Sequence, residues 1–85
     1  MSTVTVKLFA GLMKYLPVNS TKSHGFNYEI DEATTVGELV DDLNLPRDVI
    51  HIVLLNGVYL DAGNRDVRVL KEGDTLGFWP PVAGG

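Results

Sequence analysis

Hydrophobic and polar residues alternate near both ends of the chain, which is the pattern of a half-buried strand. Residues 3–9 read TVTVKLF, and residues 75–79 read TLGFW. A period of two sends successive side chains to opposite faces of a sheet. We therefore predict a strand in each segment, with the Val and Leu residues of the first, and Leu76 and Phe78 of the second, facing the core.

A helix is predicted in the middle of the chain, where the period changes. Its hydrophobic residues fall at i, i+3, i+4 and i+7, and form one stripe of an amphipathic helix: Val36, Leu39, Val40 and Leu43. Thr35 and Glu38 have the spacing of a capping box, and Pro46 prevents continuation. The opposite face carries Glu38, Asp41 and Asp42, which we expect to be solvated; contact with a partner is the less favoured alternative.

The remaining segments predict further strands and turns. Residues 26–30, FNYEI, alternate as a second strand, and residues 51–61, HIVLLNGVYLD, predict a hairpin that turns at Asn56-Gly57. A shorter extended piece, DVRVL, precedes a turn over residues 71–74. Between the first two strands, a helical turn with Phe9, Leu12, Met13 and Leu16 ends at Pro17, and a surface loop follows over residues 17–25.

The order of these elements is strand, strand, helix, strands and a final strand. One helix packed across one face of a mixed four- to five-stranded sheet is an α+β domain. This is also the order of a β-grasp (ubiquitin-like) fold, in which the first and last strands lie side by side at the centre. We expect the β-grasp domain to span residues 1–79 and a flexible Gly-Gly tail to span residues 80–85.

Composition excludes several classes of site. The 85 residues contain no cysteine, so disulfides and thiolate chemistry are excluded and a reducing, cytoplasmic location is expected. His24 and His51 lack carboxylates at ligand spacing, so no metal site is predicted. A net charge of −4 disfavours nucleic acid, and no segment is apolar enough for a membrane span.

The last eight residues, FWPPVAGG, have a distinct chemistry. Pro80-Pro81 ends the strand because proline cannot donate ladder hydrogen bonds, and the six residues from Pro80 onward reach roughly 20 Å when extended. Gly84 and Gly85 have no side chains, so they could pass through a narrow channel. A terminal carboxylate must be activated before a nucleophile can attack it, and the chain has no phosphate-binding glycine loop. The tail is therefore predicted to be a substrate for other enzymes.

Residues 70–85, LKEGDTLGFWPPVAGG, closely resemble the end of the MoaD/ThiS group of sulfur carriers. The segments VTVKLFA and VGELVDDL and the NG hairpin extend the resemblance over most of the chain. It is greatest to the small subunit of molybdopterin synthase, whose tails end in an aromatic pair followed by PPVAGG. The loop over residues 17–25 is longer than expected of a compact member.

The resemblance implies a carrier without catalytic activity. A ubiquitin-activating-type enzyme would adenylate Gly85 with ATP, and a sulfur donor would displace AMP to leave a thiocarboxylate. The tail, which includes Pro80, Pro81, Val82, Ala83 and Gly84, would then enter the large subunit of molybdopterin synthase in a heterotetramer. There the sulfur would be delivered for molybdenum cofactor biosynthesis. No cofactor would be bound by the carrier itself.

Two aromatic residues are candidates for the partner interface. Alternation places Trp79 outside, beside the start of the tail, and Phe9 outside on the neighbouring first strand. Exposed aromatics are preferred interface anchors. The alternatives are that Trp79 folds back under a loop and that Phe9 joins the helical turn.

Other functions share the Gly-Gly ending. The chain could be a ubiquitin-like modifier whose Gly85 forms isopeptide bonds with lysines, or a β-grasp interaction module whose ending is incidental. Related carriers serve thiamine synthesis, tRNA thiolation and tungsten cofactors. A self-contained enzyme is disfavoured because no set of a nucleophile, a base and a residue that orients the base is visible in the sequence.

Overall fold

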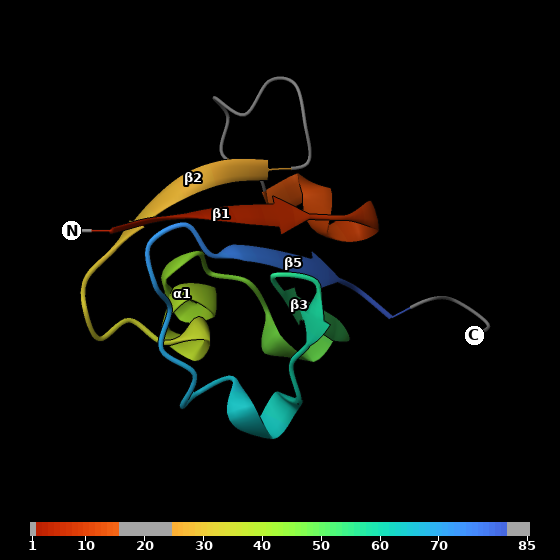
Figure 1. Cartoon of the computed structure of the whole chain (residues 1–85). Helices are drawn as coiled ribbons and strands as arrows, with labels where there is room; N and C mark the ends of the chain where they lie inside the picture. Colours follow the sequence, from red (N-terminus) through yellow and green to blue (C-terminus); the bar gives the residue numbers. More distant parts are fainter. Residues whose placement is uncertain (1, 16–24, 82–85) are drawn as a thin grey trace.

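The computed structural model describes residues 2–15 and 25–81. These residues form five strands and one α-helix, arranged in space as drawn in Figure 1. The strands are β1 (Ser2–Leu8), β2 (Gly25–Ile30), β3 (Ile52–Leu55), β4 (Val58–Tyr59) and β5 (Thr75–Trp79), and the helix is α1 (Val36–Asp42). Three short 3-10 helices connect them: η1 (Ala10–Tyr15), η2 (Arg47–Val49) and η3 (Ala62–Asn64).

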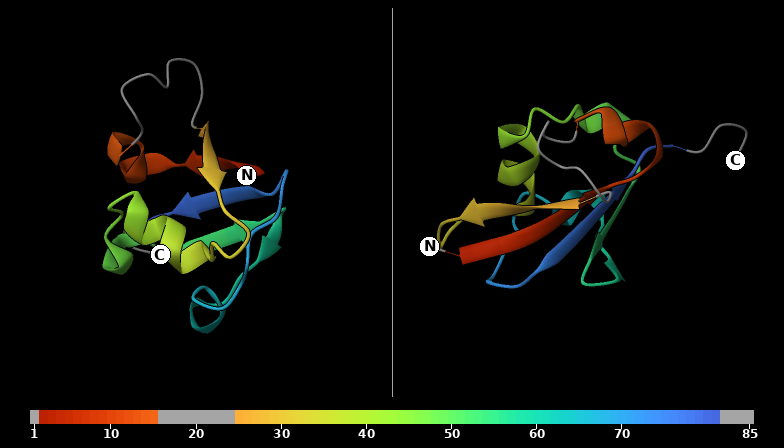
Figure 2. Two further views of the ribbon diagram at one scale, coloured as in Figure 1. Left: turned by 90° about the vertical axis from the view of Figure 1, so that its left-hand side faces the viewer. Right: turned by 90° about the horizontal axis from the view of Figure 1, so that it is seen from above.

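The strands form one mixed sheet in the order β2-β1-β5-β3-β4. The first and last strands, β1 and β5, are parallel neighbours at its centre, and every other pairing is antiparallel. Figure 2 shows α1 on one side of this sheet. The predicted α+β, β-grasp architecture is therefore confirmed, including the central position of the two terminal strands.

The core lies between α1 and the inner face of the sheet. The alternation predicted for the first and last strands is confirmed, since Val6, Leu8, Leu76 and Phe78 are each 0% exposed. The helix contributes the predicted stripe, with Val36, Leu39 and Val40 buried and Leu43 half-buried at its C-cap.

Both helix ends have the local chemistry that the sequence indicates. Thr35 and Glu38 form the capping box, in which the Glu38 N–H donates to Thr35 Oγ1 at 3.1 Å and the Thr35 N–H donates to Glu38 Oε1 at 2.9 Å. The helix ends at Asp42, before Pro46, and Asn44 adopts a positive φ of 58°. Asparagine tolerates this left-handed conformation better than most residues.

The Asn56-Gly57 hairpin is confirmed and is anchored to β5. Both residues have positive φ, 53° and 83°, as a tight two-residue turn requires. The Asn56 amide nitrogen donates to Asp74 Oδ1 at 2.9 Å, and its amide oxygen accepts from the Thr75 N–H at 2.8 Å. The turn between β3 and β4 thus fixes the first residue of β5.

The short piece DVRVL forms only one isolated β-bridge, between Val69 and Thr35. Its backbone bonds instead to the start of α1: the Val36 N–H donates to Arg68 O, and the Leu70 N–H donates to Thr34 O. These bonds draw the segment away from the sheet, and Val67 and Val69 remain exposed. The predicted loop over residues 17–25 and the end of the predicted helical turn, Leu16 and Pro17, lie almost wholly outside the described residues.

The acidic face of α1 is exposed but also makes contacts within the chain. Asp41 pairs with Arg47 at 3.0 Å, and Asp42 Oδ2 accepts from the Tyr28 hydroxyl at 3.4 Å. Partial burial, and secondarily the Asp42 charge, raise the pKa of Tyr28. Solvation alone was therefore an incomplete prediction for this face. None of the described helices is long and apolar enough to cross a membrane.

Candidate functional site at the end of β5

The tail begins at the end of the central strand β5, which is held from both sides. The Phe9 N–H donates to Phe78 O at 3.1 Å, and the His51 N–H donates to Trp79 O at 2.8 Å. The next two residues, Pro80 and Pro81, have no N–H with which to continue the ladder. The chain therefore leaves the sheet at a defined position, from a strand whose Leu76 and Phe78 side chains are fully buried.

Trp79 and Phe9 stack against each other on the outer face of the sheet. Their ring centroids are 4.3 Å apart and their planes differ by 7°. Both side chains are half-buried. The outward position expected for Trp79 and its proximity to Phe9 are thus observed, and the Trp79 ring lies over the strand rather than beneath a loop.

Gly77 makes room for this stack. A Cβ atom at Gly77 would lie 2.8 Å and 2.9 Å from two ring atoms of Trp79 and 3.5 Å from Phe9. The indole therefore lies back along its own strand, across the one position that carries no side chain. Sequence reasoning placed Gly77 on the outer face without recognising this role, because the contact depends on the rotamer of Trp79.

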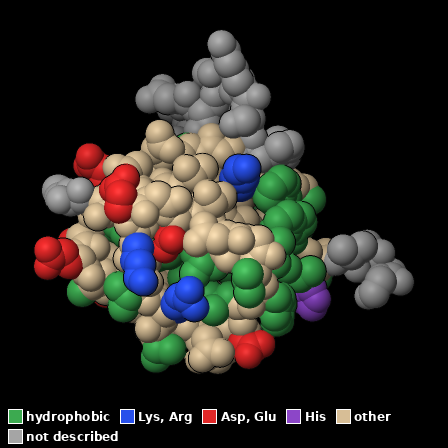
Figure 3. Space-filling view, viewed as in Figure 1, with side chains coloured by type: hydrophobic (Ala, Val, Ile, Leu, Met, Phe, Trp, Pro, Cys, Tyr) green, Lys and Arg blue, Asp and Glu red, His purple; other side chains and the backbone are tan. Residues whose placement is uncertain are grey.

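The stack belongs to a larger apolar area on the outer face. Strand register pairs Ile52 with Trp79, Leu54 with Gly77 and Tyr59 with Leu54. We define the outer patch as Phe9, Ile52, Leu54, Tyr59 and Trp79. Figure 3 shows hydrophobic side chains gathered on the side of the molecule where β5 ends. The strand residues of the patch were missed from sequence because HIVLL is apolar on both of its faces.

A shallow hollow of about 180 Å³ lies within the outer patch. It is lined by Lys7, Phe9, Leu54, Gly57, Thr75, Gly77 and Trp79. Tyr59, at the edge of the sheet, is 57% exposed. A partly exposed aromatic stack beside a hollow can accept side chains from another protein.

A second hollow, of about 220 Å³, lies where the tail begins. Its walls are Gly11, Leu12, Lys14, Tyr15, Val49, Pro80 and Pro81. The Lys14 ammonium lies 5.5 Å from the centre of the Tyr15 ring. The start of the tail therefore runs between the outer patch and a second apolar recess, so a protein that holds the tail can contact both.

The predicted tail residues divide into two groups. Pro80 is half-buried and Pro81 is exposed, whereas Val82, Ala83, Gly84 and Gly85 lie outside the described residues. No group of three or more His, Cys, Asp or Glu side chains that could hold a metal ion occurs in the described part of the chain. The described residues thus place the start of the tail beside an apolar surface.

Comparison with known proteins identifies the family. The model of the ThiS family matches residues 6–85, whereas no curated protein is significantly similar in sequence. SAMP1 from Haloferax volcanii is 26% identical, with a TM-score of 0.66 over 99% of this chain and 100% of that protein.

Two further solved structures have the same fold. The thiamine biosynthesis protein ThiS from Geobacter metallireducens is 23% identical, with a TM-score of 0.66 over 98% of this chain and 99% of that one. A complex of subunits 1 and 2 of the molybdopterin-converting factor from Helicobacter pylori contains a chain 24% identical, with a TM-score of 0.62 over 98% of this chain and 99% of that one. The resemblance seen in the sequence is confirmed: the chain belongs to the ThiS family of ubiquitin-like sulfur carriers.

Proposed function

We propose that this protein carries sulfur as a thiocarboxylate on Gly85. The observation that carries the proposal is the PPVAGG tail on the firmly held central strand of a ThiS-family fold, in a match that runs to Gly85. The chain itself supplies only the carboxylate. It binds no cofactor, works in the cytoplasm and depends on partner enzymes for catalysis.

The chemistry requires two steps on the partner. A Gly85 carboxylate oxygen attacks the α-phosphorus of ATP, and pyrophosphate leaves to give an acyl-adenylate. The sulfur of a donor then attacks the carbonyl carbon, and AMP departs with one carboxylate oxygen. Where the donor is hydrosulfide, loss of its proton leaves Gly85 with one sulfur and one oxygen. Where it is a persulfide, a second thiol cleaves the S–S bond of the acyl disulfide, which leaves the same thiocarboxylate and a disulfide between that thiol and the donor. A ubiquitin-activating-type adenylating enzyme supplies the ATP site and the electrophile activation.

The favoured partner for the loaded tail is the large subunit of molybdopterin synthase, in molybdenum cofactor biosynthesis. The aromatic pair before PPVAGG and the subunit 1–subunit 2 complex of the Helicobacter pylori factor support this choice. In the proposed heterotetramer, Phe9 and Trp79 contact the large subunit while Pro80 to Gly85 enter its active site. The sulfur atom is transferred to the pterin precursor, and the Gly85 carboxylate is regenerated when water supplies an oxygen.

A second candidate is a ubiquitin-like protein modifier. SAMP1, the small archaeal modifier protein 1 of Haloferax volcanii, supports this alternative; a second structure of it is 27% identical to this chain, with a TM-score of 0.68 over 96% of this chain and 100% of that one. Adenylation of Gly85 is common to both functions. They differ in the nucleophile, which is sulfur for the carrier and a lysine amine for the modifier.

Reconstitution with the activating enzyme of the same organism tests the proposal. The protein would be incubated with that enzyme, ATP and a sulfide source, and its intact mass measured. We expect a mass gain equal to exchange of one oxygen for sulfur, and no gain in a variant that lacks Gly85. Val67→Ala, at an exposed position outside the outer patch, is the matched control.

A chain that remains unmodified, while the same enzyme loads its known carrier, would contradict the sulfur-carrier function. Gly85 joined through an isopeptide bond to lysines of added protein would favour the modifier.

A further inference from the structure

Two arginines on the helix-covered side of the molecule have very different surroundings. Arg47 is fully engaged: its Nε donates to Asp41 Oδ1 at 3.1 Å, its Nη1 donates to Asp66 Oδ2 at 3.2 Å, and its Nη2 donates to Gly37 O at 3.2 Å. The hydrogen bond from Arg47 lowers the pKa of Asp66. Two carboxylates thus balance the charge of Arg47.

Arg65 has no carboxylate partner among the described residues. Its side-chain Nη2 donates to His51 O at 3.3 Å. Its Nε is enclosed and has no hydrogen-bond partner in the described part of the chain. Enclosed polar atoms are nearly always paired, so an unpaired donor on a charged group is a feature to be explained.

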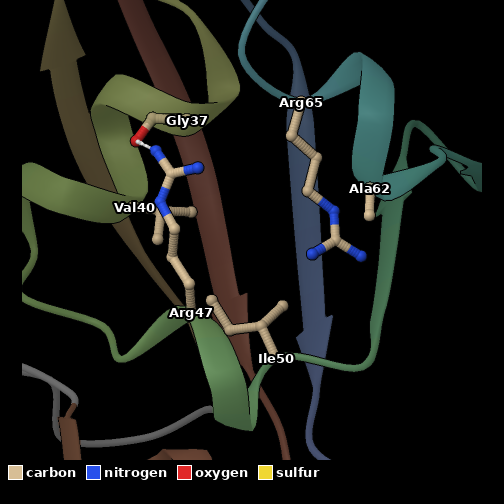
Figure 4. A pocket seen from close by; sticks show the side chains of 6 residues that line it. All are labelled: Gly37, Val40, Arg47, Ile50, Ala62 and Arg65. Atoms are coloured by element: carbon tan, nitrogen blue, oxygen red, sulfur yellow. Dashed lines mark hydrogen bonds between the residues drawn. The ribbon is translucent and has the colours of Figure 1, made fainter.

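The two arginines line a cavity of about 190 Å³. The other lining residues are Gly37, Val40, Ile50 and Ala62. Figure 4 shows the Arg47 and Arg65 side chains on opposite sides of it, with Ile50 between them. Asp41 and Asp66 bind Arg47 and do not line the cavity. The cavity therefore combines aliphatic walls with one uncompensated guanidinium.

We propose that this cavity, the Arg65 pocket, binds the carboxylate of a glutamate side chain from a partner protein. A guanidinium presents parallel N–H groups that match a carboxylate, and such charge-assisted pairs are among the strongest hydrogen bonds in proteins. Val40, Ile50 and Ala62 would cover the methylene groups of the glutamate stem. A phosphate ion has no apolar stem to use these walls.

The place of the pocket supports a protein as the source of the carboxylate. His51 accepts from Arg65 through its carbonyl and donates through its N–H to Trp79 O, the last strand residue before the tail. His51 therefore links the Arg65 pocket to the residue from which the tail starts, so a protein that holds the tail lies close to the pocket. The binding does not depend on sulfur transfer, and the test below uses no activating enzyme.

An NMR titration of the ¹⁵N-labelled full chain tests the site. The probe is N-acetyl-glutamate N-methylamide, and the matched control is N-acetyl-glutamine N-methylamide. We expect saturable shifts at the Arg65 Nε–H and at the amides of Gly37, Val40, Ile50 and Ala62, with a dissociation constant on the order of 10 mM. The glutamine compound should not saturate.

Variants assign the binding to the guanidinium. Arg65→Gln should weaken binding of the glutamate compound about tenfold or more, as expected for loss of a charge-assisted hydrogen bond. Arg65→Lys keeps the charge without the planar fork and should cause a smaller loss. Arg68→Gln, at a residue that lines a different hollow beside Tyr59, should have no effect. Melting curves of each variant establish that the domain remains folded.

Three results would overturn the proposal: no saturable shift at the pocket amides, equal binding of the glutamine compound, or unchanged binding in folded Arg65→Gln. Control titrations with sodium acetate and sodium phosphate distinguish recognition of a free anion from recognition of a glutamate side chain. Tighter binding of either ion would contradict recognition of the aliphatic stem and the partner-protein source.

Discussion

The two faces of the central strands follow the same alternation but serve different ends. On the inner face, Leu76 and Phe78 of β5 are completely buried against α1 and the rest of the core. On the outer face, Gly77 and Trp79 of the same strand form part of a half-exposed apolar surface. One strand of five residues therefore supplies both the centre of the core and the start of the candidate site.

A small domain can in this way hold a tail firmly and still present it. Burial of the inner residues fixes the position of β5 between β1 and β3. The side chains on the outer face can then contact other proteins, because the packing of the core does not depend on them. Changes on the inner face should unfold the domain, and changes on the outer face should alter recognition.

The largest effect is expected from Phe78→Ala on the inner face. Removing a fully buried aromatic side chain leaves a cavity and costs about 3–5 kcal/mol in free energy of unfolding. Urea denaturation measures the loss. If Phe78→Ala and Trp79→Ala lowered the free energy of unfolding by similar amounts, the two faces would contribute alike to stability, which would contradict the distinction between them.

A smaller effect is expected from Gly77→Ala, on the outer face beneath the Trp79 ring. The new Cβ would lie 2.8 Å from the Trp79 ring, so the indole must move, at a cost of about 1–3 kcal/mol. Trp79 is the only tryptophan, so its fluorescence reports the displacement as a shift to longer wavelength. Gly63→Ala is the matched control, since its Cβ would meet nothing within 4 Å. An unchanged spectrum in Gly77→Ala would show that the stack tolerates a side chain there.

Trp79→Ala should affect binding more than stability. Loss of the stack with Phe9 should lower the free energy of unfolding by about 1 kcal/mol. Binding to the activating enzyme or to the large subunit should weaken about thirtyfold or more, as for an interface hot spot. Calorimetry and urea denaturation measure the two quantities separately. Unchanged affinity together with a large loss in the free energy of unfolding would show that Trp79 belongs to the core and not to the interface.

The smallest effect concerns Asp66, which is exposed and lies on neither face of the sheet. The Arg47 hydrogen bond lowers the pKa of Asp66 below its usual 3.8, so the unfolded state binds a proton more readily than the folded state. The stabilisation is present above about pH 4 and is lost as pH falls through the lowered folded pKa. Asp66→Asn should remove this part of the acid dependence and leave the rest. Thermal melts between pH 2 and pH 7 measure this. Parallel profiles of melting temperature against pH for the original protein and for Asp66→Asn would contradict it.

The local features of the fold could be predicted from the sequence because each depends on neighbouring residues. The alternation in β1 and β5, the Thr35–Glu38 capping box and the Asn56-Gly57 turn all have signatures within a few positions. The outward placement of Trp79 beside Phe9 followed from the same alternation once the β-grasp order placed the first and last strands together.

Other features depend on contacts between distant segments, and no local pattern reveals them. The bonds that draw residues 66–70 to the start of α1 join positions more than thirty apart, as in Leu70 N–H to Thr34 O. The pairing of Arg47 with Asp66, and the fact that Arg65 pairs with no carboxylate among the described residues, likewise appear only in the folded chain. The contribution of Leu54 to the outer patch required the register of β3 on β5.

Intact-mass analysis of the protein isolated from its own cell tests whether Gly85 carries sulfur. We expect a population in which one carboxyl oxygen of Gly85 is replaced by sulfur, and this population should disappear on treatment that hydrolyses thiocarboxylates. An unmodified chain under conditions in which the cell is loading its other sulfur carriers would contradict it, as would additional residues that permanently follow Gly85.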